Sequence, residues 1–363
     1  MRDLRSLTAR QILSVTEPES LFSFCEVSAR KEYRQLIRLW HPDSSGNKRD
    51  TGRVINHLAA LYRQAIAVRK AGTWREPVDK VESEVTGRRR FLLADGSIRE
   101  FDYVRSRPFE GGRMFIAEHA VGFEVDGEFE DLYRQAVKRI FSLGFADREM
   151  ASQIGPCLPE ILDSFIARTG PVLIVRKTPD QLLLADVLEH FGGSISPVEH
   201  LGWILNVLYN IACYLQWSGI THNAIAADTL FVSPMRHTGM LLGGWWYSAP
   251  LKERLLALPS RCLDFAPPDI VACKRADIRL DLESIKALGR ELLGDRTGAR
   301  LDFESDSGSD VVPEALRAWL LCPTTGRAES DYFTFKHEVL TESFGAPRFV
   351  KMSLDSQALY REG

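Results

Sequence analysis

The chain has 363 residues, of which 45% are hydrophobic, and its formal net charge is −3. This length suits two domains, and this share of hydrophobic residues supports packed cores and excludes a broadly disordered chain. The charge is unevenly distributed, because residues 26–70 hold ten Lys or Arg and four Asp or Glu, whereas the rest of the chain is acidic. A basic module on an acidic chain indicates an anionic partner, and we favour an acidic protein surface over a nucleic acid.

Targeting and redox signals favour a cytoplasmic protein. Residues 1–5 lead into no apolar segment, so no signal peptide is predicted. The most apolar helical stretch, residues 201–217, contains Asn206, Asn210 and Gln216, and we interpret it as a buried helix rather than a membrane span. Six cysteines are scattered without paired spacing, so neither a zinc site nor a disulfide framework is predicted. We expect no metal, no cofactor and no membrane partner.

The first strongly patterned element is an amphipathic helix that ends near residue 40. One face is an apolar stripe with i, i+3, i+4 and i+7 spacing, formed by Tyr33, Leu36, Ile37 and Trp40. Another face is basic and consists of Arg30, Lys31, Arg34 and Arg38. Pro42 cannot continue a helix, so we expect His41 and Asp43 on an exposed loop.

A second helix is predicted after this loop. Beyond the polar residues 44–48, apolar residues at helical spacing run from Val54 to Ala65. Two amphipathic helices joined by a short loop bury their stripes against each other as an antiparallel pair. A shorter helix is expected before them, over residues 8–13.

Residues 5–70 resemble the J domain of DnaJ-type co-chaperones. The resemblance rests on residues 31–43, where a Tyr-Arg-x-Leu element stands at the family's spacing from His41, Pro42 and Asp43. It implies that these three residues and the basic face of the preceding helix bind a DnaK-type heat-shock chaperone and stimulate its ATP hydrolysis. We place this domain at residues 1–71.

A charged linker is predicted at residues 72–87. After it, the spacing of apolar residues changes from helical to strand-like. Strand-like runs at residues 91–93 and 98–101 flank Asp95-Gly96, which is typical of a β-hairpin. The remaining elements are expected as strands at 114–117, 121–125 and 172–176, and helices at 130–143 and 197–216. Strands followed mainly by helices indicate an α+β fold with a small lobe, residues 88–178, and a helical lobe, residues 179–350. We expect residues 351–363 to form a tail.

The order of these elements resembles a protein kinase over residues 105–345. Residues 219–232 stand where the family has its catalytic loop and a short strand, and residues 240–246 stand in the place of the Asp-Phe-Gly motif. Residues 266–269 resemble the end of the activation segment. Asp281 opens a helix like the central helix of the lower lobe, and Arg327 matches a lower-lobe arginine.

The residues that phosphoryl transfer needs are missing from this alignment. In the catalytic loop, the aspartate, the following lysine and the metal-binding asparagine are replaced by Ala224, Ala226 and Thr229. The aspartate of Asp-Phe-Gly falls on Gly243 or Gly244. Without these groups nothing would stabilise the transferring phosphoryl group, so the resemblance implies a catalytically silent domain, a pseudokinase.

Three further expectations concern this domain. Glu124 stands where the phosphate-pairing lysine would be, and we predict that it forms an ion pair with Arg134 or Lys138 of the next helix. His222 matches a structural histidine of the family, and we expect it to brace the core. Of the adjacent tryptophans at residues 245–246, only one should be buried, because neighbouring residues on a strand face opposite sides.

The leading functional hypothesis is an adaptor co-chaperone. The N-terminal domain would stimulate a DnaK-type chaperone, and the kinase-like domain would hold a client or scaffold protein. Two alternatives stay open: a divergent kinase-fold enzyme that is a nucleotide-dependent transferase, and a non-chaperone assembly scaffold.

Overall fold

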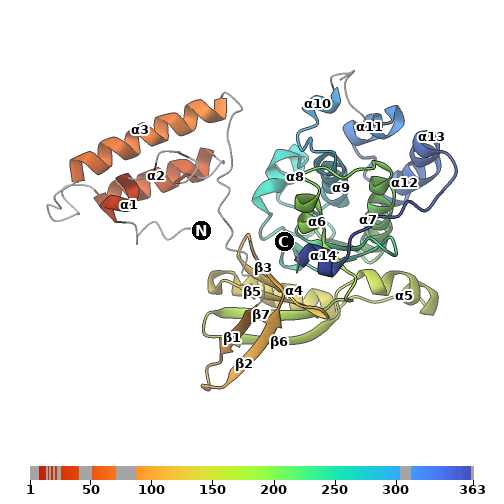
Figure 1. Ribbon diagram of the computed structural model, residues 1–363, viewed down its shortest axis with the longest axis horizontal. Helices are drawn as coiled ribbons and strands as arrows, with labels where there is room; N and C mark the ends of the chain where they lie inside the picture. Colours follow the sequence, from red (N-terminus) through yellow and green to blue (C-terminus); the bar gives the residue numbers. More distant parts are fainter. Residues whose placement is uncertain are drawn as a thin grey trace. The chain divides into compact units, whose positions relative to one another are not determined.

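The computed structural model describes residues 8–13, 15, 18, 21–22, 26–40, 51–70, 87–302 and 312–360. They belong to two compact units, Met1–Glu82 and Ser83–Gly363, which we call the N-terminal unit and the C-terminal unit (Figure 1). The boundary between the units lies within the predicted linker at residues 72–87. None of the helices in these ranges is both long and apolar enough to cross a membrane.

The N-terminal unit is helical. Its elements are α1 (Ala9–Leu13), α2 (Glu26–Trp40) and α3 (Thr51–Lys70). Their apolar stripes meet in one small core, in which Leu36 of α2 and Leu58 of α3 are fully buried. Tyr33, at the middle of α2, stacks on Tyr62, in the second half of α3, with the ring centroids 4.4 Å apart. The apolar stripes of the two helices therefore pack against each other, as their spacing predicted.

The small lobe of the C-terminal unit is built on a five-stranded antiparallel sheet. Its strands are β3 (Arg105–Phe109), β4 (Gly112–Ile116), β5 (Ala120–Val125), β6 (Ile161–Ala167) and β7 (Gly170–Arg176). Their order in the sheet is β3-β4-β5-β7-β6. Helix α4 (Glu130–Phe141) packs on one face, where the Tyr133 hydroxyl donates to the Val172 carbonyl at 3.2 Å.

A separate hairpin covers the other face of this sheet. It consists of β1 (Gly87–Leu92) and β2 (Ile98–Tyr103), joined through the predicted turn at Asp95-Gly96. The rings of Phe91 and Tyr103 lie 6.1 Å and 5.1 Å from the ring of Phe115 on β4. The sheet is therefore buried on both faces, between α4 and the hairpin.

The larger lobe is mainly helical, and in Figure 1 its helices lie to one side of the sheet. The long helices α7 (Glu199–Trp217) and α9 (Ile278–Leu292) pack against each other. The shorter helices are α5 (Arg148–Ile154), α6 (Leu184–His190), α8 (Pro268–Cys273), α10 (Ala299–Asp302), α11 (Glu314–Leu321), α12 (Ala328–Thr334), α13 (Leu340–Phe344) and α14 (Ser356–Tyr360). The short strands are β8 (Leu182–Leu183), β9 (Ile220–Thr221), β10 (Leu230–Ser233), β11 (Thr238–Leu241) and β12 (Ala249–Pro250). Tight turns complete the lobe, among them the 3₁₀ turn η4 (Trp245–Tyr247).

Residues 351–360, which fall in the expected tail, pack into the C-terminal unit. Met352, Leu354 and Tyr360 are each 5% exposed or less. The Tyr360 hydroxyl accepts a hydrogen bond from the Leu183 N–H at 3.1 Å. This part of the chain belongs to the folded core, because its apolar side chains fill space beside α6.

Candidate functional site

A row of arginines lies on the exposed side of α2. Arg30, Arg34 and Arg38 are exposed, whereas Leu36 and Trp40 on the opposite side of the helix are buried. Because the arginines recur every four residues, their guanidinium groups share one face of the helix. Lys31 lies in the same helix. His41, Pro42 and Asp43 lie outside the described residues, and α2 ends at the residue before them.

In the C-terminal unit, the segment that resembles a catalytic loop packs directly against a pair of glycines. A Cβ added to Gly244 would lie 2.9 Å from both the Ala224 Cβ and the His222 Cε1. A Cβ added to Gly243 would lie 3.1 Å from the Thr229 Cα. These contacts leave little room for a larger side chain, least of all at Gly244, because packed interiors tolerate little added volume.

The other positions that the sequence singled out in this loop are Ala224, Ala226 and Thr229. Ala224 and Ala226 are buried methyl groups. The Thr229 hydroxyl accepts from the Ala226 N–H at 3.0 Å and donates to the Ala224 carbonyl at 2.9 Å. This loop is thus packed by two buried methyl groups and by a hydroxyl whose hydrogen bonds stay within the loop itself.

His222 is a fully buried neutral imidazole. Its Nε2 donates to the Gly243 carbonyl at 3.0 Å, and burial lowers its pKa to about 3. The backbone N–H groups of His222 and Asn223 donate to the Asp281 carboxylate at 2.8 Å and 2.6 Å. Burial nevertheless raises the pKa of Asp281 to about 7. This arrangement fixes the loop on α9 and fits a bracing role for His222.

Glu124 faces the β1–β2 hairpin. Its Oε1 accepts from Arg89 Nη2 at 2.6 Å and its Oε2 from Arg89 Nε at 3.1 Å, and Thr169 Oγ1 donates at 2.5 Å. The predicted ion pair with Arg134 or Lys138 is therefore wrong. Those residues belong to α4, on the opposite face of the sheet, where Arg134 pairs within its own helix.

Alternation along β5 decides which residues face the space between the lobes. A Cβ added to Gly122 would lie 3.5 Å from Phe101 of the hairpin, whereas Val121, Phe123 and Val125 join the core that contains α4. Glu124 therefore faces the hairpin and not the helical lobe. The residue that faces the helical lobe is Phe123, which is apolar.

Aromatic rings occupy the space between the two lobes. Trp246 stacks on Phe109 of β3, with ring centroids 4.7 Å apart, and meets Phe123 edge to face at 5.4 Å. Trp245 is fully buried, and its Nε1 donates to the Leu241 carbonyl at 2.8 Å. The expectation that only one tryptophan is buried is wrong, because these residues form a 3₁₀ turn, in which successive side chains are about 120° apart.

Polar contacts also join the lobes. Glu110, in the turn between β3 and β4, accepts from the Ser260 N–H at 2.9 Å and from its hydroxyl at 3.1 Å. Arg107 of β3 donates to Glu189 of α6 at 2.9 Å and also pairs with Asp186, which is 2% exposed. The sheet is therefore held to the helical lobe at two places.

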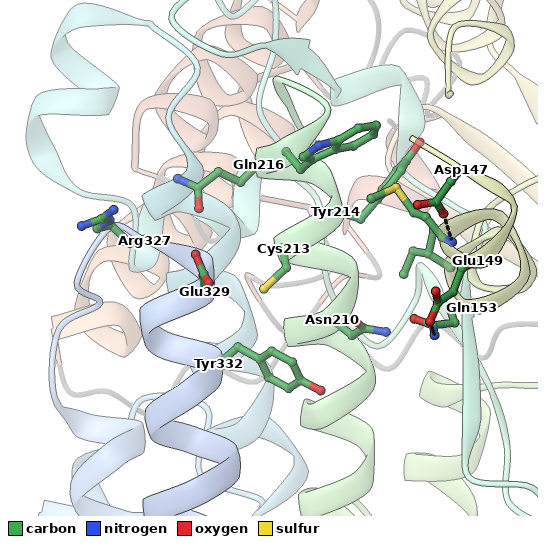
Figure 2. A pocket seen from close by; sticks show the side chains of 13 residues that line it. Asp147, Glu149, Gln153, Asn210, Cys213, Tyr214, Gln216, Arg327, Glu329 and Tyr332 are labelled. Carbon is green, nitrogen blue, oxygen red and sulfur yellow. Dashed lines mark hydrogen bonds between the residues drawn. The ribbon is translucent and has the colours of Figure 1, made fainter. Parts of the chain in front are cut away.

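The acidic residue of the segment at 266–269 pairs with an arginine of the helical lobe other than Arg327. Asp269, on α8, pairs with Arg279 of α9 at 2.5 Å. Arg327 instead lies at the start of α12, beside a groove that the sequence did not indicate (Figure 2).

This groove lies over α7, with α5 and α12 as its walls, and has a volume of about 730 Å³. Figure 2 shows side chains of both flanking helices directed toward α7. The groove is lined along α7 by residues with i, i+3, i+4 and i+7 spacing, Asn210, Cys213, Tyr214 and Trp217, of which Asn210 and Trp217 are exposed and Tyr214 is buried. The amide side chains within this apolar helix are the one feature of the sequence that indicates a solvent-exposed part of it. Among the described residues, no group of three His, Cys, Asp or Glu could hold a metal ion.

No known protein family matches the chain, and no curated protein matches it. Among solved structures, the chain is similar to the kinase domain of PF14_0431, with a TM-score of 0.43 and 12% sequence identity. The match covers 56% of this chain and 65% of that one, which is less than two thirds of its length. A match at this identity concerns the fold alone.

Proposed function

We propose that this protein is an adaptor co-chaperone, in which a J domain stimulates the ATPase of a DnaK-type chaperone. The observation that carries the proposal is the row of Arg30, Arg34 and Arg38 on the exposed face of α2, a helix that ends immediately before His41-Pro42-Asp43. A row of positive charge on a rigid helix favours an anionic protein surface and speeds its association.

The C-terminal unit would act as a catalytically silent, kinase-like domain that holds a client or scaffold protein. Phosphoryl transfer needs a carboxylate base, metal ligands and a cation on the phosphates. The aligned positions hold Ala224, Thr229 and Glu124, and the contacts of Gly244 leave little space for an acidic side chain. Ring contacts of Trp246 occupy the region between the lobes. These features support binding rather than catalysis.

They also count against the alternative of a nucleotide-dependent transferase, which needs a phosphate site between the lobes. The second alternative, a scaffold without chaperone binding, does not explain the arginine row of α2.

The test is single-turnover ATP hydrolysis by a DnaK-type chaperone in the presence of the full chain. We expect stimulation that is lost with His41→Gln and weakened with Arg34→Ala, and that falls as salt screens the arginine row. Matched controls are His119→Gln, at an exposed position of the C-terminal unit, and Arg63→Ala, at an exposed position of α3. Absence of stimulation, or stimulation that His41→Gln leaves unchanged, would refute the proposal.

A separate titration tests the kinase-like domain. We expect no binding of ATP with magnesium or manganese to the full chain by calorimetry. If Trp246→Ala strengthened nucleotide binding, the space between the lobes could admit a nucleotide once the indole is removed. Phosphoryl transfer by the full chain or by this variant would contradict the proposal that the domain is catalytically silent.

A further inference from the structure

The floor of the groove over α7 exposes large aromatic surface. Trp217, the last residue of α7, is 52% exposed and lies 5.9 Å from the ring of Tyr214. Phe145, which is 38% exposed, also lies near this tyrosine, 5.8 Å from its ring, but it does not line the groove. Tyr214 itself is 4% exposed, so the exposed aromatic surface of the groove is that of Trp217. An exposed tryptophan in a groove is typical of sites that bind a partner.

The rim of the groove is acidic. Asp147 and Glu149 stand on the α5 side and Glu329 on the α12 side, against a single cation, Arg327 (Figure 2). Within residues 87–302 and 312–360, none of these three carboxylates forms an ion pair. Burial raises the pKa of the Cys213 thiol on the groove floor to about 11, and the charge of Glu329 contributes to the rise. The groove is thus apolar at its floor and negatively charged around it.

The shape of the groove matches a helix better than a compact ligand. Its floor stripe, from Asn210 to Trp217, covers two turns of α7, or roughly 10 Å. It is flanked along this length by two other helices, α5 and α12. Grooves of this form take amphipathic helices, which insert side chains at i, i+3, i+4 and i+7 spacing.

We propose that this groove binds a basic amphipathic helix of a partner protein. Aliphatic side chains of that helix would contact Trp217, and its lysines or arginines would pair with Glu149 and Glu329. The inference rests on the proposed function, in which the C-terminal unit holds a client or scaffold, and it names the surface and the chemistry of that partner.

The test uses the full chain and a fluorescein-labelled synthetic peptide of about five helical turns. The peptide carries leucine at i, i+3, i+4 and i+7 positions and lysine elsewhere, and binding is followed by fluorescence anisotropy. A second peptide has glutamate in place of every lysine, and a third has the composition of the first in scrambled order. We expect the basic amphipathic peptide to bind, the scrambled peptide to bind more weakly and the acidic peptide not to bind.

Variants of the groove separate specific docking from general attraction. Trp217→Ala should weaken binding by about tenfold or more, as expected for a central aromatic contact. Glu329→Lys should weaken binding and reduce its salt dependence. Arg327→Glu should strengthen binding, because it removes the one cation of the rim. The matched controls, Leu256→Ala and Glu118→Lys, change an apolar and an acidic residue that are exposed elsewhere and should leave binding unchanged.

Three results would overturn the inference. One is no binding of the basic peptide, including the case in which only a small polycation such as spermine binds. Another is equal binding by the acidic peptide. The third is a peptide affinity that does not depend on the groove. This would be seen if Glu118→Lys changed the affinity as strongly as Glu329→Lys, or if neither Trp217→Ala nor Arg327→Glu changed it. The chaperone assay depends on His41 and not on this groove, so failure of the peptide assay and failure of the proposed function are distinguishable.

Discussion

His222 and Asp281 should give the C-terminal unit two opposing pH dependences. Burial lowers the pKa of His222 from 6.5 to about 3 and raises that of Asp281 from 3.8 to about 7. The histidine binds a proton more readily in the unfolded chain, so its contribution to stability grows as pH rises from about 3 to 6.5. The aspartic acid binds a proton more readily in the folded chain. Its contribution is complete below pH 3.8 and is lost as pH rises through about 7.

The two contributions cancel where their ranges overlap. Between about pH 4 and pH 6.5, the unfolded chain carries one proton on His222 and the folded chain carries one on Asp281. Equal numbers of bound protons give no slope of the unfolding free energy from this pair. When one of the two groups is removed, the pH dependence due to the other becomes measurable. The slope of the unfolding free energy then approaches about 1.4 kcal/mol per pH unit.

Urea unfolding of the full chain, followed by tryptophan fluorescence across this pH range, measures the effect. Relative to the unaltered protein, the unfolding free energy of Asp281→Asn should rise with pH, and that of His222→Gln should fall with pH. Taking each difference at the same pH cancels the contributions of all other groups. His119→Gln, at an exposed position, is the control and should show neither trend.

A flat difference for Asp281→Asn would refute the reasoning for that residue. It would mean that the two backbone N–H groups that bind the carboxylate outweigh the cost of its burial, so that it stays ionised in the folded protein. Slopes of the same sign in the two variants would refute the assignment of opposite shifts.

Three predictions concern the contacts around the sheet, and urea unfolding measures each. Trp246→Ala should lower the unfolding free energy by about 3–5 kcal/mol, because it empties the space between the lobes; a loss below about 1 kcal/mol would mean that the rings are not packed there. Arg89→Met should lower the unfolding free energy by about 2 kcal/mol, because it leaves the Glu124 carboxylate without its cation. Adding Glu124→Gln should restore much of this loss. If the effects of the two substitutions were additive, the pairing would be contradicted. Gly112→Ala should cost several kcal/mol, because the new Cβ would lie 2.0 Å from the Glu124 carbonyl; a stability equal to that of the unaltered protein would show that β4 and β5 are not paired as described.

The elements that could be predicted from the sequence are those with a local pattern of residues. Helical spacing of apolar residues predicted α2 and α3, and the structure places these helices at Glu26–Trp40 and Thr51–Lys70. The Asp95-Gly96 turn predicted the first hairpin, and apolar runs predicted strands β4, β5 and β7 and helices α4 and α7. Such patterns can be read from the chain because each helix or strand repeats over a few residues. The arginine row of α2 follows from the same periodicity.

Which residues meet across the fold depends on contacts between distant segments. The sequence predicted that Glu124 pairs with a cation of α4, but alternate residues of a strand face opposite sides of a sheet, and its partner Arg89 comes from a hairpin 35 positions earlier. The two tryptophans are both buried because their segment is a 3₁₀ turn, which packs between lobes built from distant segments. The edge strands β3 and β6 lacked a clear apolar run, and residues 351–360 join the core through Tyr360 and Leu183, 177 positions apart. The groove over α7 is formed because α5 and α12 flank that helix without covering it completely. Which residues of α7 stay exposed depends on these neighbouring helices, and no local sequence pattern records them.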